Sequence, residues 1–166
     1  MHELLLLRHA KTEFSSQSGR DFDRELRRRG HNDSALAAQW IREQGCIPDA
    51  VVSSPARRAQ QTAELVCRHL ELDYAQVYWE PGLYEASPGE LIRIAENYVR
   101  YARVMMVGHN PGFEMLARIL ATDAQFRNVP TAGVAYLSWG DEEAQLEPHT
   151  AELKGFFRPS TVRNQD

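Results

Sequence analysis

Two histidines each follow a short apolar run, and their surroundings suit chemistry on phosphate. His9 comes after residues 4–7 with Arg8 between, and His109 follows residues 104–107 after a single glycine. A neutral imidazole can attack phosphorus and carry the phosphoryl group as a covalent intermediate. If the two runs are neighbouring parallel strands, both imidazoles emerge at one edge of the sheet, where α/β proteins form their sites. The pair therefore indicates phosphoryl transfer.

Arginines accompany these histidines and are suited to holding the phosphate. Arg8 offers a planar, permanently charged guanidinium directly before the first histidine. Ser54 as the N-cap and Pro55 at the first helical position predict a helix start. Arg57 and Arg58 then fall in the first turn, where free amides and the helix dipole favour an anion. Adjacent helical positions point about 100° apart, so at most one of these two arginines faces the pocket.

The bulk composition is that of an ordinary globular enzyme rather than of a nucleic-acid or membrane protein. The chain has 166 residues and a net charge of −4, which favours a single domain and disfavours charge-driven binding to nucleic acid. No segment approaches the about 18 apolar residues that span a membrane, and the four leucines near the start are too few for a signal peptide. Cys46 and Cys67 form no CxxC motif, so a cytoplasmic location is expected.

Strand and helix patterns alternate along the chain, and this alternation must position the candidate residues. Strands are expected at residues 3–7, 50–53, 76–79, 103–107, 134–139 and 153–157. Helices are expected at residues 30–43, from Pro55 through Leu70, from Pro88 after a Ser87 capping box, and from Pro111 after Asn110. The acidic residues 141–143 fit a turn, so the last two strands are predicted to be antiparallel.

The alternation predicts one α/β domain with a mostly parallel central sheet. We expect residues 1–159 to form this single domain and residues 160–166 to be a flexible tail. Residues 11–23 are polar and read as a long loop, which in a compact domain is often functional. Most of the basic stretch that follows, Arg24 and Arg27 to Arg29, reads as a solvated approach to a helix.

A metal or nucleotide site is not indicated. The histidines lack the HxxxH spacing, a cysteine pair and a dense carboxylate set, which argues against zinc. The chain also lacks the GxxxxGK[ST] loop of nucleotide-binding proteins. The expected chemistry therefore needs neither metal nor cofactor.

Three motifs together resemble the histidine phosphatase superfamily, which has the phosphoglycerate mutase-like fold. They are Arg8-His9-Ala10, the segment SSPARRAQQT at residues 53–62, and Gly108-His109, and they occur in the family's order over nearly the full length. The short chain, the segment DFDREL at residues 21–26 and the VGHNPG segment look most like the small SixA-type phosphohistidine phosphatases. This resemblance implies a three-layer α/β/α sandwich.

The resemblance also implies roles for individual residues. His9 is the nucleophile that becomes phosphorylated, and Arg8, Arg58 and His109 hold the phosphoryl group. Arg58, directly before an alanine, matches the family arginine, which leaves Arg57 outside the pocket. Arg24 matches a further phosphate-contacting arginine of the small branch. Glu85 lies where larger members place their acidic proton donor, so it is a candidate catalytic acid.

These observations predict a metal-independent phosphatase that acts in two steps on protein phosphohistidine, with a phosphohistidine-bearing signalling protein as its partner. Glu85 keeps an alternative open, because a P–O ester needs its departing alkoxide protonated whereas a P–N bond to imidazole needs a much weaker acid. That alternative is a small-molecule phosphomonoesterase or, less favoured in so short a chain, a mutase. A third hypothesis is an inactive phosphate-binding or interaction module.

Overall fold

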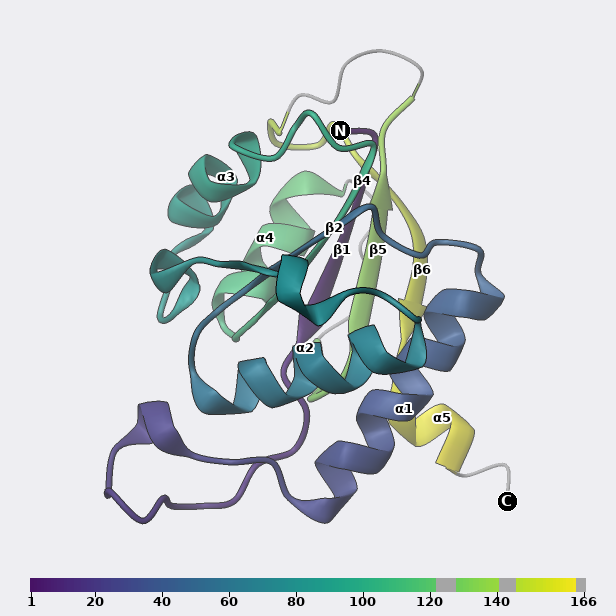
Figure 1. Cartoon of the computed structure of the whole chain (residues 1–166). Helices are drawn as coiled ribbons and strands as arrows, with labels where there is room; N and C mark the ends of the chain where they lie inside the picture. Colours follow the sequence, from purple (N-terminus) through teal and green to yellow (C-terminus); the bar gives the residue numbers. More distant parts are fainter. Residues whose placement is uncertain (122–127, 141–145, 164–166) are drawn as a thin grey trace.

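The computed structural model describes residues 1–121, 128–140 and 146–163. These residues form a six-stranded sheet between two layers of helices, which is the expected three-layer α/β/α fold (Figure 1). The strand order is β3-β2-β4-β1-β5-β6. The strands span β1 Glu3–Arg8, β2 Ala50–Ser53, β3 Tyr78–Trp79, β4 Arg103–Gly108, β5 Val134–Ser138 and β6 Glu152–Phe157.

The sheet is parallel through its centre and antiparallel at one side. Strands β3, β2, β4 and β1 are parallel neighbours, whereas β5 is antiparallel to both β1 and β6. This confirms the predicted mostly parallel sheet and the antiparallel closing pair. In the β1–β4 pairing Arg8 lies opposite Gly108, so the next residue of each strand is a histidine. Two separate apolar runs thereby bring their histidines to one sheet edge.

Helices cover both faces because successive residues of each strand point to opposite sides. Leu5 and Leu7 pack with α1 and α2, whereas Leu4 and Leu6 pack with α3 and α4. All four leucines are fully buried, which explains a continuous apolar run in place of an alternating one. The helices span α1 Arg28–Glu43, α2 Arg57–His69, α3 Pro88–Glu96, α4 Gly112–Leu120 and α5 Pro159–Arg163.

The helix starts agree with the sequence at α3 and differ at α2. The hydroxyl of Ser87 accepts the backbone N–H of Glu90 at 3.2 Å, as the capping box predicts. The helix predicted to begin at Pro55 with Ser54 as N-cap instead begins at Arg57 with Ala56 as N-cap. The Ser54 hydroxyl accepts the N–H of Ala56 at 3.2 Å and also lies against a histidine ring, so it serves the site and not the helix.

The structure differs from the sequence-based expectation near the C-terminus and at β3, and two expected features lie outside the described residues. Residues 160–163, expected within a flexible tail, belong to α5, whose Arg163 bonds the carboxylate of Asp33 on α1. The side chain of Asp33 is only 3% exposed, and a buried carboxylate needs a cationic partner, so this ion pair joins α5 to α1. The predicted strand at residues 76–79 shortens to β3, because Tyr74–Gln76 forms a 3-10 turn. The predicted turn at residues 141–143 lies outside the described residues, as do residues 164–166.

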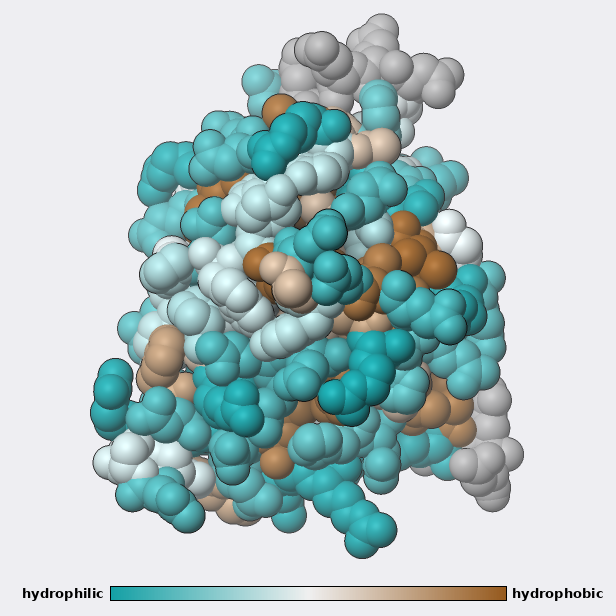
Figure 2. Space-filling model, in the orientation of Figure 1, coloured by the Kyte–Doolittle hydropathy of each residue, from teal (hydrophilic) through white to brown (hydrophobic). Residues whose placement is uncertain are grey.

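The surface of the described residues is largely polar. Figure 2 shows mostly hydrophilic residues on this face, with hydrophobic ones in separate patches. Within these residues no helix combines the length and the apolar character needed to cross a membrane. Cys46 and Cys67 are buried free thiols.

Candidate active site

The two motif histidines meet at the carboxyl end of the central strands. His9 follows β1 and His109 follows β4, and the centroids of their rings are 5.2 Å apart. The backbone N–H of His9 donates to the carbonyl oxygen of Gly108 at 2.9 Å, which extends the strand pairing to the histidine itself. Both residues are 8% exposed. The sheet therefore holds two nearly buried imidazoles side by side at one edge, with their ring planes tilted by 51°.

His9 has the arrangement of a neutral imidazole with one free ring nitrogen. Its Nδ1 lies 2.9 Å from the carbonyl oxygen of Ala10, an acceptor only, so Nδ1 carries the proton and Nε2 keeps a free lone pair. Burial lowers the pKa of His9 to about 3, against the opposing effect of the bond to Ala10. The nearby His109, Arg58 and Arg8 lower this pKa further. The imidazole is therefore unprotonated at neutral pH, as attack on phosphorus requires.

His109 offers a donor that nothing in the described residues uses. Its Nε2 lies 2.8 Å from the hydroxyl of Ser54, and its Nδ1 is buried without a hydrogen-bond partner. Burial, followed by the charge of Arg58, lowers the pKa of His109 to about 4. We assign the Ser54 hydroxyl as donor to Nε2, which places the ring proton on Nδ1. A buried, unsatisfied N–H beside the nucleophile suits an incoming phosphoryl oxygen.

Arg8 is the second residue with an unsatisfied buried nitrogen. It ends β1, its Nη1 donates to the carbonyl oxygen of Val129 at 3.0 Å, and its Nε has no hydrogen-bond partner among the described residues. Burial lowers the pKa of this guanidinium, yet an arginine remains charged at neutral pH. Within the described residues, the two buried polar side-chain atoms left without a hydrogen-bond partner thus belong to two residues beside His9, namely His109 and Arg8.

Arg58 lies in the pocket and Arg57 does not. The side chain of Arg58 is 8% exposed and donates through Nη1 and Nη2 to the backbone oxygen and the carboxylate of Asp21, at 2.9 and 3.0 Å. The side chain of Arg57 is 44% exposed and pairs with Glu25 at 3.5 Å. The helical offset of two consecutive residues separates them as the sequence predicts.

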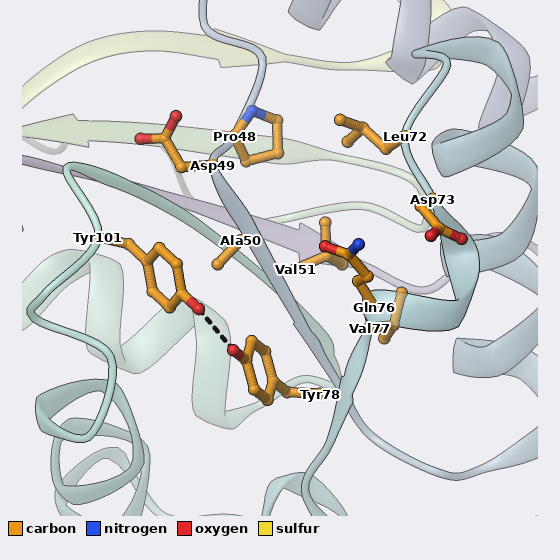
Figure 3. A pocket seen from close by; sticks show the side chains of 10 residues that line it. All are labelled: Pro48, Asp49, Ala50, Val51, Leu72, Asp73, Gln76, Val77, Tyr78 and Tyr101. Carbon is orange, nitrogen blue, oxygen red and sulfur yellow. Dashed lines mark hydrogen bonds between the residues drawn. The ribbon is translucent and has the colours of Figure 1, made fainter.

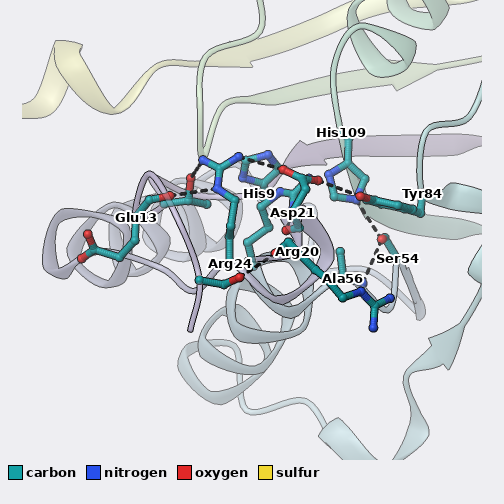
Figure 4. Close-up of polar contacts among 12 residues, drawn as sticks. His9, Glu13, Arg20, Asp21, Arg24, Ser54, Ala56, Tyr84 and His109 are labelled. Atoms are coloured by element: carbon teal, nitrogen blue, oxygen red, sulfur yellow. Dashed lines mark hydrogen bonds and ion pairs between the residues drawn. The ribbon is translucent and has the colours of Figure 1, made fainter. Parts of the chain in front are cut away.

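Asp21 forms ion pairs with Arg24 and Arg58, the two candidate phosphate-binding arginines that come after β1 in the chain. Arg24 donates to one carboxylate oxygen at 2.9 Å, and Arg58 and the hydroxyl of Tyr84 donate to the other, at 3.0 and 2.7 Å (Figure 4). The hydrogen bond from Tyr84, followed by those from the two arginines, holds the pKa of Asp21 well below its usual range. Asp21 is therefore a permanent anion that orients these donors.

Arg24 is held in place by hydrogen bonds to three residues of the loop. Besides the carboxylate of Asp21, its Nε donates to the backbone oxygen of Glu13 at 2.9 Å and its Nη2 to the hydroxyl of Thr12 at 2.6 Å. Thr12 also forms an isolated antiparallel bridge with Leu26, which closes the base of the loop. The loop that the sequence marks as functional thus delivers Asp21 and Arg24 together.

Glu85 lies on the wall of an open cavity of about 570 Å³ that also contains Arg58 and His109. It is exposed, and its φ of 58° is a left-handed conformation that costs a non-glycine residue about 1–2 kcal/mol. The adjacent Ala86 is held against α4, since a Cβ at Gly112 would lie 2.5 Å from the Ala86 carbonyl oxygen. The full lining comprises Asp21, Arg58, Tyr84, Glu85, Ala86, Ser87, Glu90, His109, Asn110, Pro111 and Gly112.

The structure brings all six sequence-predicted residues to one region, but not into equal positions. His9, Arg8 and His109 form the buried inner part, and Arg58 joins them to the cavity. Arg24 reaches the group through Asp21, and Glu85 stands on the outer wall. Sequence reasoning missed Asp21 and Tyr84 as members of the site. Their one available signal was the position of Asp21 three residues before Arg24 in the segment DFDREL.

Other clusters offer less chemistry. A cavity of about 120 Å³ lies at the amino end of β2, and its lining, which includes Tyr78 and Tyr101, holds no histidine or arginine (Figure 3). Within residues 1–121, 128–140 and 146–163, no three His, Cys, Asp or Glu side chains are grouped as a metal site would need. Unlike that cavity, the group around His9 combines imidazoles with arginines.

Comparison with known proteins agrees with this geometry. The model of the histidine phosphatase superfamily (branch 1) matches residues 4–103. The uncharacterised protein Rv1276c of Mycobacterium tuberculosis is 36% identical over 166 residues, with 92% of this chain and 99% of that protein covered.

Two solved structures of similar sequence have the same fold. A protein of Agrobacterium tumefaciens assigned as the phosphohistidine phosphatase SixA has a TM-score of 0.81 at 26% identity, covering 95% of this chain and 98% of its own. A protein of Nakamurella multipartitia with the same assignment has a TM-score of 0.78 at 28% identity, covering 95% and 96%. The likeness therefore extends over nearly the whole of each chain.

Proposed function

The chain belongs to the histidine phosphatase superfamily, and we propose that it is a metal-independent phosphatase whose His9 becomes phosphorylated during turnover. One observation carries this proposal. The Nδ1 of His9 is bound to the Ala10 carbonyl oxygen, and the ring is neutral, so Nε2 presents a lone pair. An inert binding module needs the arginines but has no need of a nucleophile prepared in this way.

In the first step, the Nε2 lone pair of His9 attacks phosphorus and forms a P–N bond. The bond from phosphorus to the leaving group breaks, and its electron pair departs with that group, which takes up a proton. Charge in the transition state spreads over the three equatorial oxygens. Arg8, Arg58 and the Nδ1–H of His109 are the donors available to these oxygens, and burial strengthens each interaction.

In the second step, water attacks the phosphorus of the phosphohistidine and the P–N bond breaks. The electron pair of that bond returns to Nε2, and the oxygen of water becomes the fourth oxygen of inorganic phosphate. One of the two water protons stays on the phosphate and the other is released to solvent, which balances the proton taken up by the leaving group in the first step. The low pKa of His9 makes its neutral form the resting state, so the same residue is ready for the next cycle. Asp21 supports both steps by holding Arg58 and Arg24 in position.

We propose protein phosphohistidine as the substrate, with a phosphohistidine-bearing signalling protein in the cytoplasm as partner. The cavity supports this, because it is open on the side of Glu85 and can admit a side chain presented by another protein. An imidazole leaving group also needs little assistance from an acid. The likeness to two proteins assigned as SixA favours the same substrate class.

The alternative is a small-molecule phosphomonoesterase, and one observation favours it. Glu85 is on the cavity wall with Arg58 and His109, where a carboxylic acid could protonate a departing alkoxide. Under either substrate the covalent step on His9 is the same, so the two functions differ in the role of Glu85 alone.

The test is to look for the covalent intermediate directly. A reaction with an aryl phosphate, quenched under denaturing alkaline conditions that preserve P–N bonds, should show phosphate on His9 by mass spectrometry. The variant His9→Ala should lose turnover, whereas His31→Ala, a matched change of an exposed histidine, should not. Prolonged EDTA treatment should leave the wild-type rate intact. Label on another residue, or normal turnover of His9→Ala, contradicts the proposal.

A further inference from the structure

The active-site cavity is cationic at its inner end and anionic at its mouth. Resting on the proposed function, we infer that Glu85 and Glu90 select substrates in which basic side chains flank the phosphorylated residue. The partner surface is therefore a positively charged segment of a phosphoprotein, and a phosphoryl group that neighbours acidic groups is disfavoured. Glu85 and Glu90 thus act on the part of the substrate outside the phosphoryl group, whereas the residues around His9 act on the phosphoryl group itself.

The inner end of the cavity is the place for the phosphoryl group. His109 lines the cavity and its Nδ1 is buried without a hydrogen-bond partner among the described residues. The Nε of Arg8, the residue before His9, is likewise buried and unpartnered there. Among the described residues that line the cavity, Arg58 is the only arginine or lysine, and two of its nitrogens already donate to Asp21. The positive charge is thus concentrated at the inner end of the cavity, and the carboxylate of Asp21 partly neutralises it.

The mouth carries the opposite charge. Three of the lining residues, Asp21, Glu85 and Glu90, bear carboxylates. Asp21 is bound by two arginines and a tyrosine, whereas within the described residues neither Glu85 nor Glu90 has a hydrogen-bond or ion-pair partner for its carboxylate. Both glutamates are exposed, so their carboxylates face whatever enters the cavity.

The two glutamates approach the mouth from one continuous segment. Glu90 is in the first turn of α3, where a negative side chain is favoured by the helix dipole. Glu85 precedes that helix and reaches the cavity wall through its left-handed backbone. Since a bound phosphoryl dianion occupies the cationic inner end, the remainder of the substrate meets this unpaired negative charge. Complementary charge at such a rim raises the association rate and rejects like-charged partners.

The experiment compares three phosphohistidine peptides that are identical except for flanking lysines, glutamines or glutamates. At low ionic strength, kcat/KM for the lysine peptide should exceed that for the glutamate peptide by about tenfold. The ratio should shrink towards one at 1 M salt, where the Debye length is about 3 Å. The variant Glu90→Lys should lower the ratio at least roughly threefold. The matched control Glu96→Lys makes the same charge change on α3 away from the cavity lining and should preserve the ratio.

The outcomes separate this inference from the proposed function. Hydrolysis of all three peptides at equal rates, or a ratio that Glu96→Lys changes as much as Glu90→Lys does, overturns the selection by the mouth and leaves the phosphatase intact. A preference for the glutamate peptide overturns it as well. Failure to hydrolyse any of the peptides, with normal turnover of an aryl phosphate, overturns the proposed phosphohistidine substrate and the inference together.

Discussion

The neutral histidines of the site should make the protein lose stability in mild acid. A histidine whose pKa is lower in the folded state than in the unfolded state binds fewer protons when folded. Stability then rises with pH across the interval between the two values. For His9 the interval runs from about 3 to the unfolded value near 6.5, and for His109 from about 4 to the same value. The stabilising contribution is complete above the unfolded pKa and is lost as pH falls towards the folded one.

The size of the effect follows from the same values. At pH 5 an unfolded histidine is almost fully protonated while His9 and His109 remain almost fully neutral. Moving from pH 8 to pH 5 therefore costs about 2 kcal/mol of unfolding free energy for each residue, or about 4 kcal/mol for both. That is a large part of the about 5–15 kcal/mol that stabilises a typical domain.

The assay is urea denaturation at pH 8, 6 and 5 for the wild type and for His9→Asn, His109→Asn and the double variant. Between pH 8 and pH 5 each single variant should lose about 2 kcal/mol less than the wild type. The exposed His31→Asn serves as the matched control and should follow the wild type. Carboxylates titrate alike in all variants, so they cancel in the comparison. Equal pH dependence of the wild type and the double variant would refute the assignment of two buried neutral imidazoles.

The remaining predictions concern catalysis. Arg58→Ala should lower kcat/KM for an aryl phosphate by about 10²-fold or more, because a charge-assisted contact to the transition state is lost; Arg57→Ala, on the exposed neighbouring residue, should change it little, and equal defects would contradict the helical offset. Glu85→Gln should reduce hydrolysis of an alkyl phosphate by about 10²–10⁴-fold and that of a phosphohistidine protein only mildly. A wild type that strongly prefers the alkyl phosphate and loses this preference with Glu85 would support the esterase.

Much of the fold could be predicted from residues that lie close together in the sequence. The apolar run at residues 4–7 predicted β1, and full burial of these residues is what a central parallel strand requires. The capping box at Ser87 predicted the start of α3 because its hydrogen bond joins residues three apart. The angle between neighbouring helical positions likewise predicted that only one of Arg57 and Arg58 faces the pocket, and the family resemblance indicated Arg58. Each of these features is decided by residues close together in the chain.

The start of α2 and the presence of α5 were not predicted correctly, and both depend on contacts between residues far apart in the sequence. Ser54 has the residue type of an N-cap, but its hydroxyl contacts His109, a residue 55 positions away. Arg163 lies in a segment whose sequence resembles a frayed terminus, yet it pairs with Asp33, 130 positions away. Local propensity is worth less than satisfying a buried polar group, so these long-range partners decide the local structure.

The sequence alone therefore predicted the fold class, the placing of His9 and His109 at the same edge of the sheet, and the arginines near them. Only the tertiary structure decided that Asp21 joins Arg24 to Arg58 and receives Tyr84, because these contacts span up to 63 positions and depend on the path of a loop. It also decided that Glu85 and Glu90 face the cavity mouth. Periodicity specifies which side of an element is buried, but the approach of two loops is set by packing of the whole domain, which no local pattern encodes.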